Sequence, residues 1–277
     1  MGAYVRAQSA DTKLMTPAEI CEKHLVPTLF APWAKLVLKG RAPAEGQSAL
    51  DVACGTGLGA RLLAEAVGPQ GSVTGVDNDE AMLAMAETVA PAPSAASIKW
   101  QQASADDMPF ADQSFDYVLC LEGIQFFPNR TRAVREMRRV LRPEGVLVAS
   151  VWGAIEQNPG YAALAEGLKK FIAPEAANLA AVSLSDPVAT KQVFEAAGFG
   201  KVEVKVTSLD VTFPSSAALV DWIAGGSHST QRKFALLDHA KRQQFYAFVA
   251  SHLTTYKTDD GLRLPTCRNV CIASGRR

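Results

Sequence analysis

The 277-residue sequence predicts an α/β fold built on a doubly wound, mostly parallel sheet. From Ser48 onward, short apolar runs alternate with amphipathic helical segments, which is the pattern of a parallel sheet covered on both faces. A glycine-rich turn follows the first apolar run, as is typical where a buried strand passes into a helix. Hydrophobic residues make up 48% of the chain, which is enough for a core and excludes a disordered protein.

Strands and helices alternate in strict order through the first half of this region. The expected strands are 49–53, 72–76, 98–102, 117–121 and 146–152, and the expected helices are 59–67, 79–90 and 131–141. On the helix expected over 79–90, the inward residues are expected to be Met82, Met85 and Val89. Strand–helix–strand connections are right-handed, so the ligand of such a sheet lies at the carboxyl ends of its strands. The loops that follow the strands are therefore the expected functional loops.

The second half of the chain departs from this alternation. The expected helices there are 158–173, 187–197, 215–225 and 231–253, and the expected strands are 201–213 and 268–273. The two strands complete a seven-stranded sheet, but about 50 residues separate them, far beyond an ordinary loop. The predicted organisation is a core of 47–214 and 265–277, a helical cap of 215–264 inserted into it, and N-terminal helices 1–46 that form part of the cap.

Charge and hydropathy disfavour two classes of protein, those that bind nucleic acids and those that span a membrane. Lys plus Arg and Asp plus Glu both number 28, and this balance disfavours a dedicated nucleic-acid binder. Six arginines gather on and beside the helix expected over 131–141, where we interpret them as its solvated face. They are Arg130, Arg132, Arg135, Arg138, Arg139 and Arg142. No apolar run is long enough for a membrane span and no signal peptide is recognisable, so we expect a cytoplasmic protein.

The five cysteines are odd in number, scattered and free of any CxxC pair. This usage predicts buried, reduced thiols without a disulfide framework. Cys267 and Cys271 share a face of the last expected strand, but they lack nearby histidines and make a poor zinc site. No metal site is expected.

The glycine-rich turn runs from Asp51 to Gly59. Gly55 and Gly57 permit a tight turn and close backbone approach to a ligand, and the following helix points its free amides there. Asp77 ends the next strand, about 20 positions on, where an acid suits the two hydroxyls of a ribose. Asp77 could instead cap the following helix, although Asp79 is better placed as the cap.

Four segments resemble the successive motifs of class I S-adenosylmethionine-dependent methyltransferases: DVACGTG, VTGVDNDEAMLAMA, ASADDMPFADQSFDYVL and MRRVLRPEGVLVAS. The resemblance is nearest to the bacterial ubiquinone/menaquinone biosynthesis methyltransferases and covers about Ser48 to Ser150. Four motifs in order are far more specific than one. The resemblance implies a Rossmann-like sheet with its last strand antiparallel, S-adenosylmethionine as cofactor and S-adenosylhomocysteine as product.

The resemblance also assigns cofactor contacts. The backbone around Ala53, Gly55 and Gly57 borders the methionine part in such proteins, and Asp77 accepts hydrogen bonds from the ribose. Relatives often carry an acid where Ser104 stands, so adenine recognition here falls to Ser104, to Asp106 or to the backbone of Ala105. The complete expected set is Ala53, Cys54, Gly55, Thr56, Gly57, Asp77, Asn78, Met82, Ser104, Ala105, Asp106 and Leu121.

The loop after the fourth strand faces both the donor methyl and the acceptor in this family. Glu122 and Gln125 are the candidates there, and we expect Glu122 near the reaction centre. Because an alcohol acceptor needs a base, His228, expected in a loop between the cap helices, is the second catalytic candidate. The expected substrate contacts are Trp33, Gln125, Trp152 and Trp222. Phe126 and Phe127 are expected in the core, and Asp116 in a structural role.

Aromatic residues outside the shared motifs favour a small apolar or aromatic acceptor, such as a phenol, a quinone precursor or a secondary metabolite. O-methylation is favoured, driven mainly by proximity and orientation. Two alternatives stay open: a dinucleotide-dependent oxidoreductase, and a donor-binding protein with regulatory or non-methylating chemistry. A small-molecule acceptor is the only partner expected, without nucleic acid, and a homodimer is left open.

Overall fold

The computed structural model describes residues 15–276, apart from the side chains of His228 and Arg276. These residues form two compact units. The first holds Ile155–Leu179, Ser208–Thr266 and the described residues before Trp33; the second holds Trp33–Ala154, Ala180–Thr207 and the described residues from Cys267 onward. The predicted organisation stays a prediction; these units assign 33–46 to the second unit and 155–179, 208–214 and 265–266 to the first. That the cap covers an acceptor site stays a prediction.

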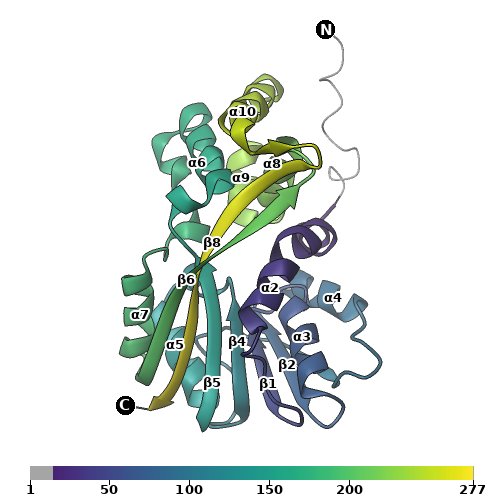
Figure 1. Cartoon of the computed structure of the whole chain (residues 1–277), viewed down its shortest axis with the longest axis vertical. Helices are drawn as coiled ribbons and strands as arrows, with labels where there is room; N and C mark the ends of the chain where they lie inside the picture. Colours follow the sequence, from purple (N-terminus) through teal and green to yellow (C-terminus); the bar gives the residue numbers. More distant parts are fainter. Residues whose placement is uncertain (1–14, 277) are drawn as a thin grey trace. The chain divides into compact units, whose positions relative to one another are not determined.

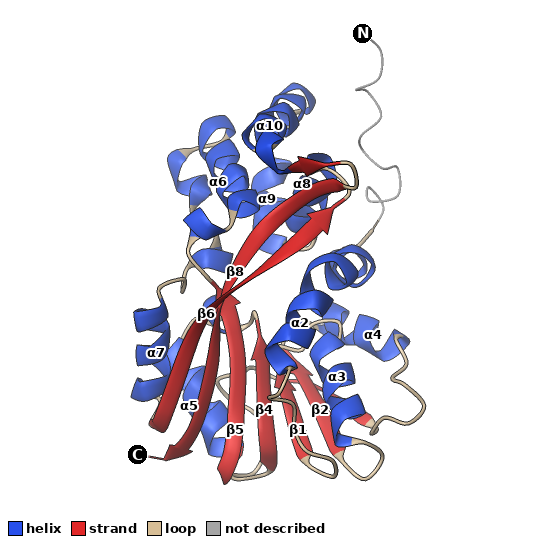
Figure 2. Ribbon diagram, in the orientation of Figure 1, coloured by secondary structure: helices blue, strands red, loops and turns tan. Residues whose placement is uncertain are grey.

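The sheet has eight strands in the order β3-β2-β1-β4-β5-β8-β6, with β7 paired to β8 off this path (Figure 2). The strands are β1 Ser48–Val52, β2 Ser72–Asp77, β3 Ile98–Gln102, β4 Phe115–Leu121, β5 Leu141–Trp152, β6 Phe199–Phe213, β7 Lys257–Thr258 and β8 Gly261–Arg276. Strands β1 to β5 pair in parallel, and β8 runs antiparallel to β5. The predicted mostly parallel sheet with an antiparallel last strand is confirmed.

Helices follow the strands in the second unit. They are α2 Ala31–Leu38, which straddles the boundary at Trp33, then α3 Leu58–Val67, α4 Glu80–Thr88, η3 Ile124–Phe126, α5 Arg130–Val140, η6 Ala180–Val182 and α7 Pro187–Ala196 (Figure 1). Each of α3, α4 and α5 leads from one parallel strand towards the next, so the carboxyl ends of β1, β2 and β4 meet at one edge of the sheet.

The first unit is mostly helical. Its helices are α1 Pro17–Ile20, η2 Cys21–Phe30, η4 Ile155–Gln157, α6 Pro159–Phe171, η5 Pro174–Ala177, α8 Ser216–Gly225, α9 His228–Ala235, α10 His239–His252 and η7 Thr254–Tyr256. Helix α1 begins with a capping box in which Thr16 and Glu19 satisfy each other's backbone amides. The helical N-terminal region is therefore confirmed for the described residues.

Two helical expectations were wrong in detail. The single helix expected over 231–253 is two helices, because Asp238 caps α10 through the Lys241 amide at 2.8 Å and starts a new helix. On α4 the inward residues are Leu83 and Ala86, not Met82 and its neighbours of the expected stripe, Met85 and Val89. The side chains at 83 and 86 are one helical turn apart and share the face turned to the sheet.

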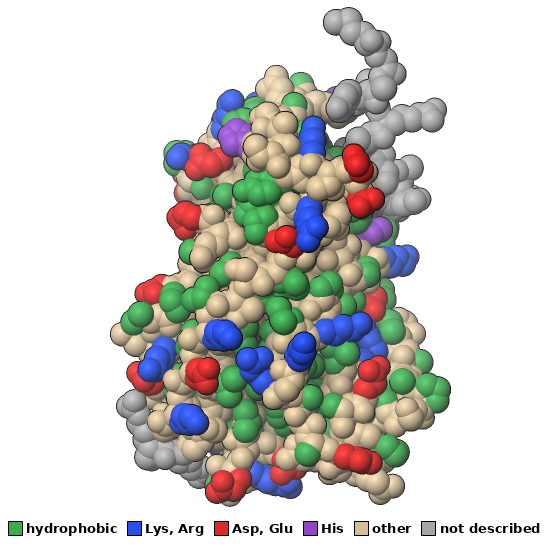
Figure 3. Space-filling view, in the orientation of Figure 1, with side chains coloured by type: hydrophobic (Ala, Val, Ile, Leu, Met, Phe, Trp, Pro, Cys, Tyr) green, Lys and Arg blue, Asp and Glu red, His purple; other side chains and the backbone are tan. Residues whose placement is uncertain are grey.

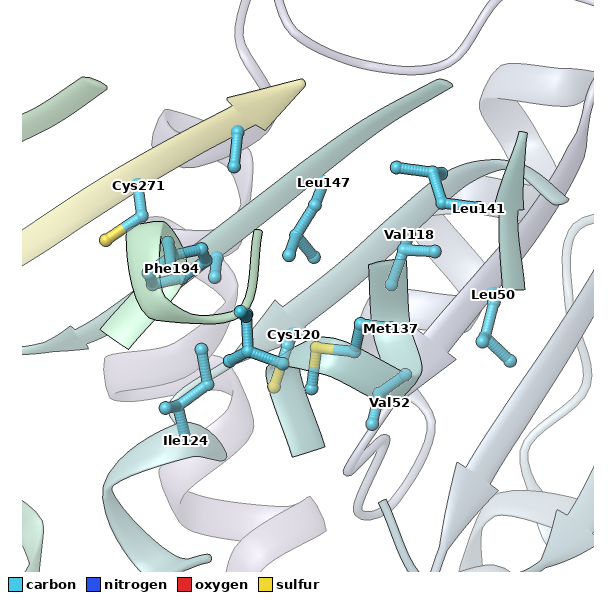
Figure 4. Close-up of a cluster of buried hydrophobic side chains, with 14 of the residues drawn as sticks. Leu50, Val52, Val118, Cys120, Ile124, Met137, Leu141, Leu147, Phe194 and Cys271 are labelled. Atoms are coloured by element: carbon cyan, nitrogen blue, oxygen red, sulfur yellow. The ribbon is translucent and has the colours of Figure 1, made fainter. Parts of the chain in front are cut away.

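The core of the second unit lies between the central strands and helices α5 and α7. Figure 4 shows Leu50, Val118 and Leu147 from three neighbouring strands beside Met137 and Phe194 from these helices. All five side chains are fully buried. Burying a side chain of this size is worth about 1.5–3 kcal/mol, so this cluster fixes the strands whose ends build the site.

The arginines around α5 do more than form a solvated face. Arg139 donates hydrogen bonds to the carbonyls of Met108 and Phe110, at 3.0 and 2.7 Å. It also pairs with Asp112 and Glu136 at 2.8 and 2.9 Å. This arginine therefore fixes the segment between β3 and β4 against α5.

Asp116 takes the structural role expected of it. Its carboxylate accepts the amide of Ser48 at 2.9 Å and pairs with Arg142 at 2.5 Å. These contacts join the first residues of β1 to the start of β5, at the end of the sheet opposite the functional loops.

Three further expectations concerned the burial of the cysteines, the distribution of surface charge and membrane-spanning helices. All five thiols are free, and four of them are buried, as predicted. Figure 3 shows acidic and basic side chains interspersed on the face it presents. Among residues 15–276, no helix is both long and apolar enough to cross a membrane.

Candidate functional site

The turn after β1 adopts the left-handed backbone conformation that its glycines predict. Ala53, Gly55 and Gly57 all have positive φ, at 57°, 53° and 87°. A Cβ atom added at Gly57 would lie 2.5 Å from the Trp100 ring, whereas one added at Gly55 would meet nothing within 4 Å. Gly57 is thus needed for packing, and Gly55 borders open space.

Asp77, the last residue of β2, is tied to this turn. Its Oδ2 accepts the amide of Gly55 at 2.8 Å, and its Oδ1 accepts the amide of Asp79 at 2.9 Å. Burial raises the pKa of the Asp77 carboxyl, against these two hydrogen bonds, which lower it. Asp79 is the helix cap, since its side chain accepts the Ala81 amide at 2.9 Å. The cap is therefore Asp79 and not Asp77, as predicted.

Asp51 lies beneath the turn and was not among the predicted site residues. It is buried, and burial raises the pKa of its carboxyl to about 7, partly offset by the hydrogen bond from the Ala60 amide. A Cβ at Gly59 would lie 2.5 Å from its Oδ2, so glycine is required there for space. Asp51 therefore supports the first turn of α3, where the helix dipole favours a negative charge.

The loop after β3 is arranged around Asp106. The Ser104 hydroxyl donates to Asp106 Oδ1 at 2.5 Å, and Arg132 donates to the Asp106 carbonyl at 3.0 Å. The Ser104 hydroxyl is thus engaged within its own loop. Nearby, Asn78 is exposed after β2 and Met82 is half-buried on α4. Contacts of all these residues with an adenine stay predictions.

The loop after β4 begins with Glu122, which, like Ala53, is a non-glycine residue with a left-handed backbone. Glu122 has φ of 57°, and its amide donates to the Ser150 carbonyl at 2.9 Å. Its Oε1 accepts the Ser150 hydroxyl at 2.8 Å and lies 2.8 Å from Nε of Arg268. Within the described residues, Oε2 of Glu122 is buried without a hydrogen-bond partner. Gln125 is also buried, and its side-chain amide donates to the Glu122 carbonyl at 2.8 Å.

Arg268 is the functional-site candidate that sequence reasoning missed. Its side chain is 0% exposed and lies across the rings of Trp152 and Trp33, with Cζ 3.3 and 4.5 Å from their centroids. Trp152 is its direct partner across the β5–β8 ladder. The signal present in the sequence was a lone arginine in the otherwise uncharged strand expected over 268–273. Trp33 and Trp152 are thus packed on a cation, and their contact with a substrate stays a prediction.

Two predicted residues belong to the first unit. Trp222 on α8 stacks on His24, with ring centroids 4.7 Å apart. His228 is the first residue of α9 rather than a loop residue, because Ser227 caps that helix. The side chain of His228 lies outside the described part of the chain, so its role as a base stays a prediction.

One expectation about the loop after β4 was wrong. Phe126 is 52% exposed, while Phe127 packs against the core as expected. The short helix η3 turns the two neighbouring rings in different directions. In the part of the chain that the structure describes, no group of three or more His, Cys, Asp or Glu could hold a metal ion.

Comparison with known proteins agrees with this arrangement. A family model described as a methyltransferase domain matches residues 50–149. The demethylmenaquinone methyltransferase of Staphylococcus carnosus (strain TM300) is 34% identical over 189 residues, covering 62% of this chain and 76% of that protein. The protein of the same name from Staphylococcus aureus (strain JH9) is 41% identical over 116 residues, covering 42% of this chain and 47% of that protein. The chain thus spans about half the length of this second relative.

A solved structure shares the fold across nearly the whole chain. A putative methyltransferase from Bacillus halodurans C-125 superposes with a TM-score of 0.59 and 20% identity, covering 89% of this chain and 100% of that one. At this identity the likeness shows the fold alone. The sequence relatives, the family model and the glycine turn joined to Asp77 lead to one conclusion: the chain belongs to the class I S-adenosylmethionine-dependent methyltransferase family.

Proposed function

We propose that this protein transfers a methyl group from S-adenosylmethionine to a small, aromatic, hydroxylated acceptor, with the acceptor oxygen favoured. The observation that carries the proposal is the bond between the Gly55 amide and the Asp77 carboxylate. It holds the glycine turn and the acid of the second strand together at the carboxyl edge of the sheet, where ligands of such sheets bind.

The residues present fit the donor. Open space adjoins Gly55, and each Asp77 carboxylate oxygen takes one backbone amide and keeps a lone pair for a ribose hydroxyl. Asp77 would hold the ribose, and the turn at Ala53 to Gly57 would border the methionine part. When bound, S-adenosylmethionine supplies a methyl group already activated on a sulfonium.

The chain's own contribution is then to hold and orient the acceptor. Proximity and alignment supply about 7–11 kcal/mol in well-oriented reactions, without a proton transfer. Glu122 is the group that we assign to the acceptor hydroxyl, because its Oε2 is buried and lacks a donor among the described residues. A phenol would provide the missing donor and satisfy this oxygen.

The acceptor class is supported by the relatives rather than by the composition of the first unit. Both named relatives are called demethylmenaquinone methyltransferases, so a hydroquinone-like ring is the starting hypothesis. Aromatic side chains of the first unit pack mostly on one another, as Phe234 does on Phe245 at 5.1 Å. Their number alone is therefore weak support for an aromatic acceptor.

A two-step experiment tests the proposal. Calorimetry and thermal unfolding first measure binding of S-adenosylhomocysteine, which should raise the melting temperature at saturation. A labelled-methyl screen across phenols, hydroquinones, amines and thiols then identifies the acceptor, and mass spectrometry locates the methylated atom. Absence of donor binding would overturn the proposal. Donor binding without transfer to any aromatic acceptor would instead favour a regulatory or non-methylating protein.

A further inference from the structure

The carboxylate of Glu122 and the guanidinium of Arg268 form a buried ion pair beside the glycine turn. Arg268 is inaccessible and Glu122 is 13% exposed, so solvent screens the pair weakly. Removing two charges from water costs several kcal/mol per ion, and hydrophobic residues often serve as well for stability. A buried pair at this edge of the sheet therefore calls for an explanation beyond packing.

The pair lies next to the turn that would hold the donor. Gly123 directly follows Glu122, and a Cβ atom added there would lie 2.8 Å from the Cβ of Ala53. Strands β1 and β4 are neighbours, with Asp51 opposite Leu119. The loop bearing Glu122 thus packs on the turn itself, and the charges of the pair act on any ligand held there.

The two charged residues of the pair have different neighbours. Arg268 is enclosed by the indoles of Trp33 and Trp152, whereas Glu122 belongs to the loop that touches Ala53. The indole faces favour the cation, and the strained backbone of Glu122 holds its carboxylate against Ser150 and Arg268. The residue that carries the negative charge is therefore the one whose neighbouring backbone packs on the turn.

We propose that this pair tunes the donor site for charge: Glu122 favours the sulfonium of S-adenosylmethionine, and Arg268 is a positioning residue that fixes and partly neutralises Glu122. The inference rests on the proposed function, since it assumes that the turn binds this donor. It adds that the balance of charge sets the preference for the cationic donor over its uncharged product. Such a preference would help the product to leave after transfer.

The test compares affinities for S-adenosylmethionine and S-adenosylhomocysteine, which differ by the methyl group and its positive charge. A unit charge about 10 Å away, at an effective dielectric constant of about 20, changes an affinity on the order of tenfold. Glu122→Gln removes the negative charge of the pair and should shift the ratio of the two affinities on the order of tenfold towards the product. Arg268→Met leaves Glu122 uncompensated and should shift the ratio the other way.

Matched variants separate charge from shape. Arg268→Lys and Glu122→Asp keep both charges and should keep the wild-type ratio, although the stacking or reach changes. The double variant Glu122→Gln with Arg268→Met removes both charges and should give a ratio between those of the wild type and Glu122→Gln, because Arg268 neutralises Glu122 only in part. Asp51 and Asp77 are unchanged throughout, so their fields cancel in the comparison. Thermal unfolding of each variant confirms that it is folded.

The outcomes are distinguishable. Opposite shifts in the two single variants, with the charge-conserving variants unmoved, support the inference. If Arg268→Met does not fold, the comparison of Glu122→Gln with Glu122→Asp decides alone. An unaltered ratio in folded Glu122→Gln would overturn the inference while leaving the proposed function intact. Failure of the wild-type protein to bind either ligand would overturn the proposed function itself.

Discussion

The amide of Gly55 donates a hydrogen bond to Oδ2 of Asp77 at 2.8 Å, and this contact joins the turn after β1 to the end of β2. A ligand that bridges the two loops meets a site already assembled, because the acid is oriented by backbone amides before the ligand arrives. Preorganisation of this kind lowers the cost of binding.

Asp77→Ala should weaken binding of S-adenosylhomocysteine. A hydrogen bond to a charged group is worth about 1.5–3 kcal/mol, so the loss should be at least about tenfold. Asp79→Ala is the matched control, because it removes the cap of α4 and costs about 1 kcal/mol of stability. Calorimetry should find its affinity unchanged. Equal affinities in both variants would show that Asp77 only joins the two loops.

Gly55→Ala and Gly57→Ala should differ although both residues have positive φ. At Gly55 the new methyl group enters open space, so the fold should lose only about 1–2 kcal/mol of left-handed strain while ligand affinity falls. At Gly57 the methyl group would meet the Trp100 ring, and unfolding free energy should fall by at least about 2 kcal/mol. Denaturant unfolding and calorimetry on both variants check this. Undiminished affinity in Gly55→Ala would place the donor elsewhere.

Ala53→Gly should raise the free energy of unfolding or leave it unchanged. The left-handed backbone at Ala53 costs about 1–2 kcal/mol for a residue with a Cβ, whereas glycine adopts it freely. The gain is reduced by about 0.4–1 kcal/mol, because glycine has more freedom in the unfolded chain. Ala64→Gly, inside helix α3, is the control and should cost about 1 kcal/mol. A similar loss in both variants would contradict the strain at Ala53.

Stability should fall as pH rises through the acid range because of Asp51. Its pKa of about 7 in the fold exceeds the ordinary 3.8, so between these values the folded protein binds the proton more strongly than the unfolded chain does. The penalty is absent below about pH 3.8, grows up to about pH 7 and is complete above it. Asp77, whose pKa burial also raises, acts in the same direction.

Asp51→Asn should flatten this dependence. The amide keeps an oxygen for the Ala60 amide but carries no charge, so it does not titrate. Urea unfolding from pH 4 to 8 measures the slope in both proteins. A slope that is the same in the variant would assign the pH dependence to Asp77 and to other groups.

Local chemistry explains which features could be predicted. The glycine turn, the strand-ending Asp77, the cap at Asp79 and the parallel strands each follow from residues close together in sequence. Helix faces were predicted less well, since the shift from Met82 to Leu83 on α4 depends on where the helix meets the sheet. The break at Asp238 was not predicted, because the apolar periodicity of a helix continues on both sides of this capping residue.

The sequence by itself determined the family and the mostly parallel sheet with an antiparallel last strand, because those motifs act through their own backbone and immediate neighbours. The tertiary structure alone decided which side chain forms an ion pair with Glu122. Arg268 reaches it from the last strand only because β8 pairs with β5 in the register that sets Arg268 against Trp152. A buried charge needs a partner, and the register of distant strands, which no local pattern encodes, supplied that partner.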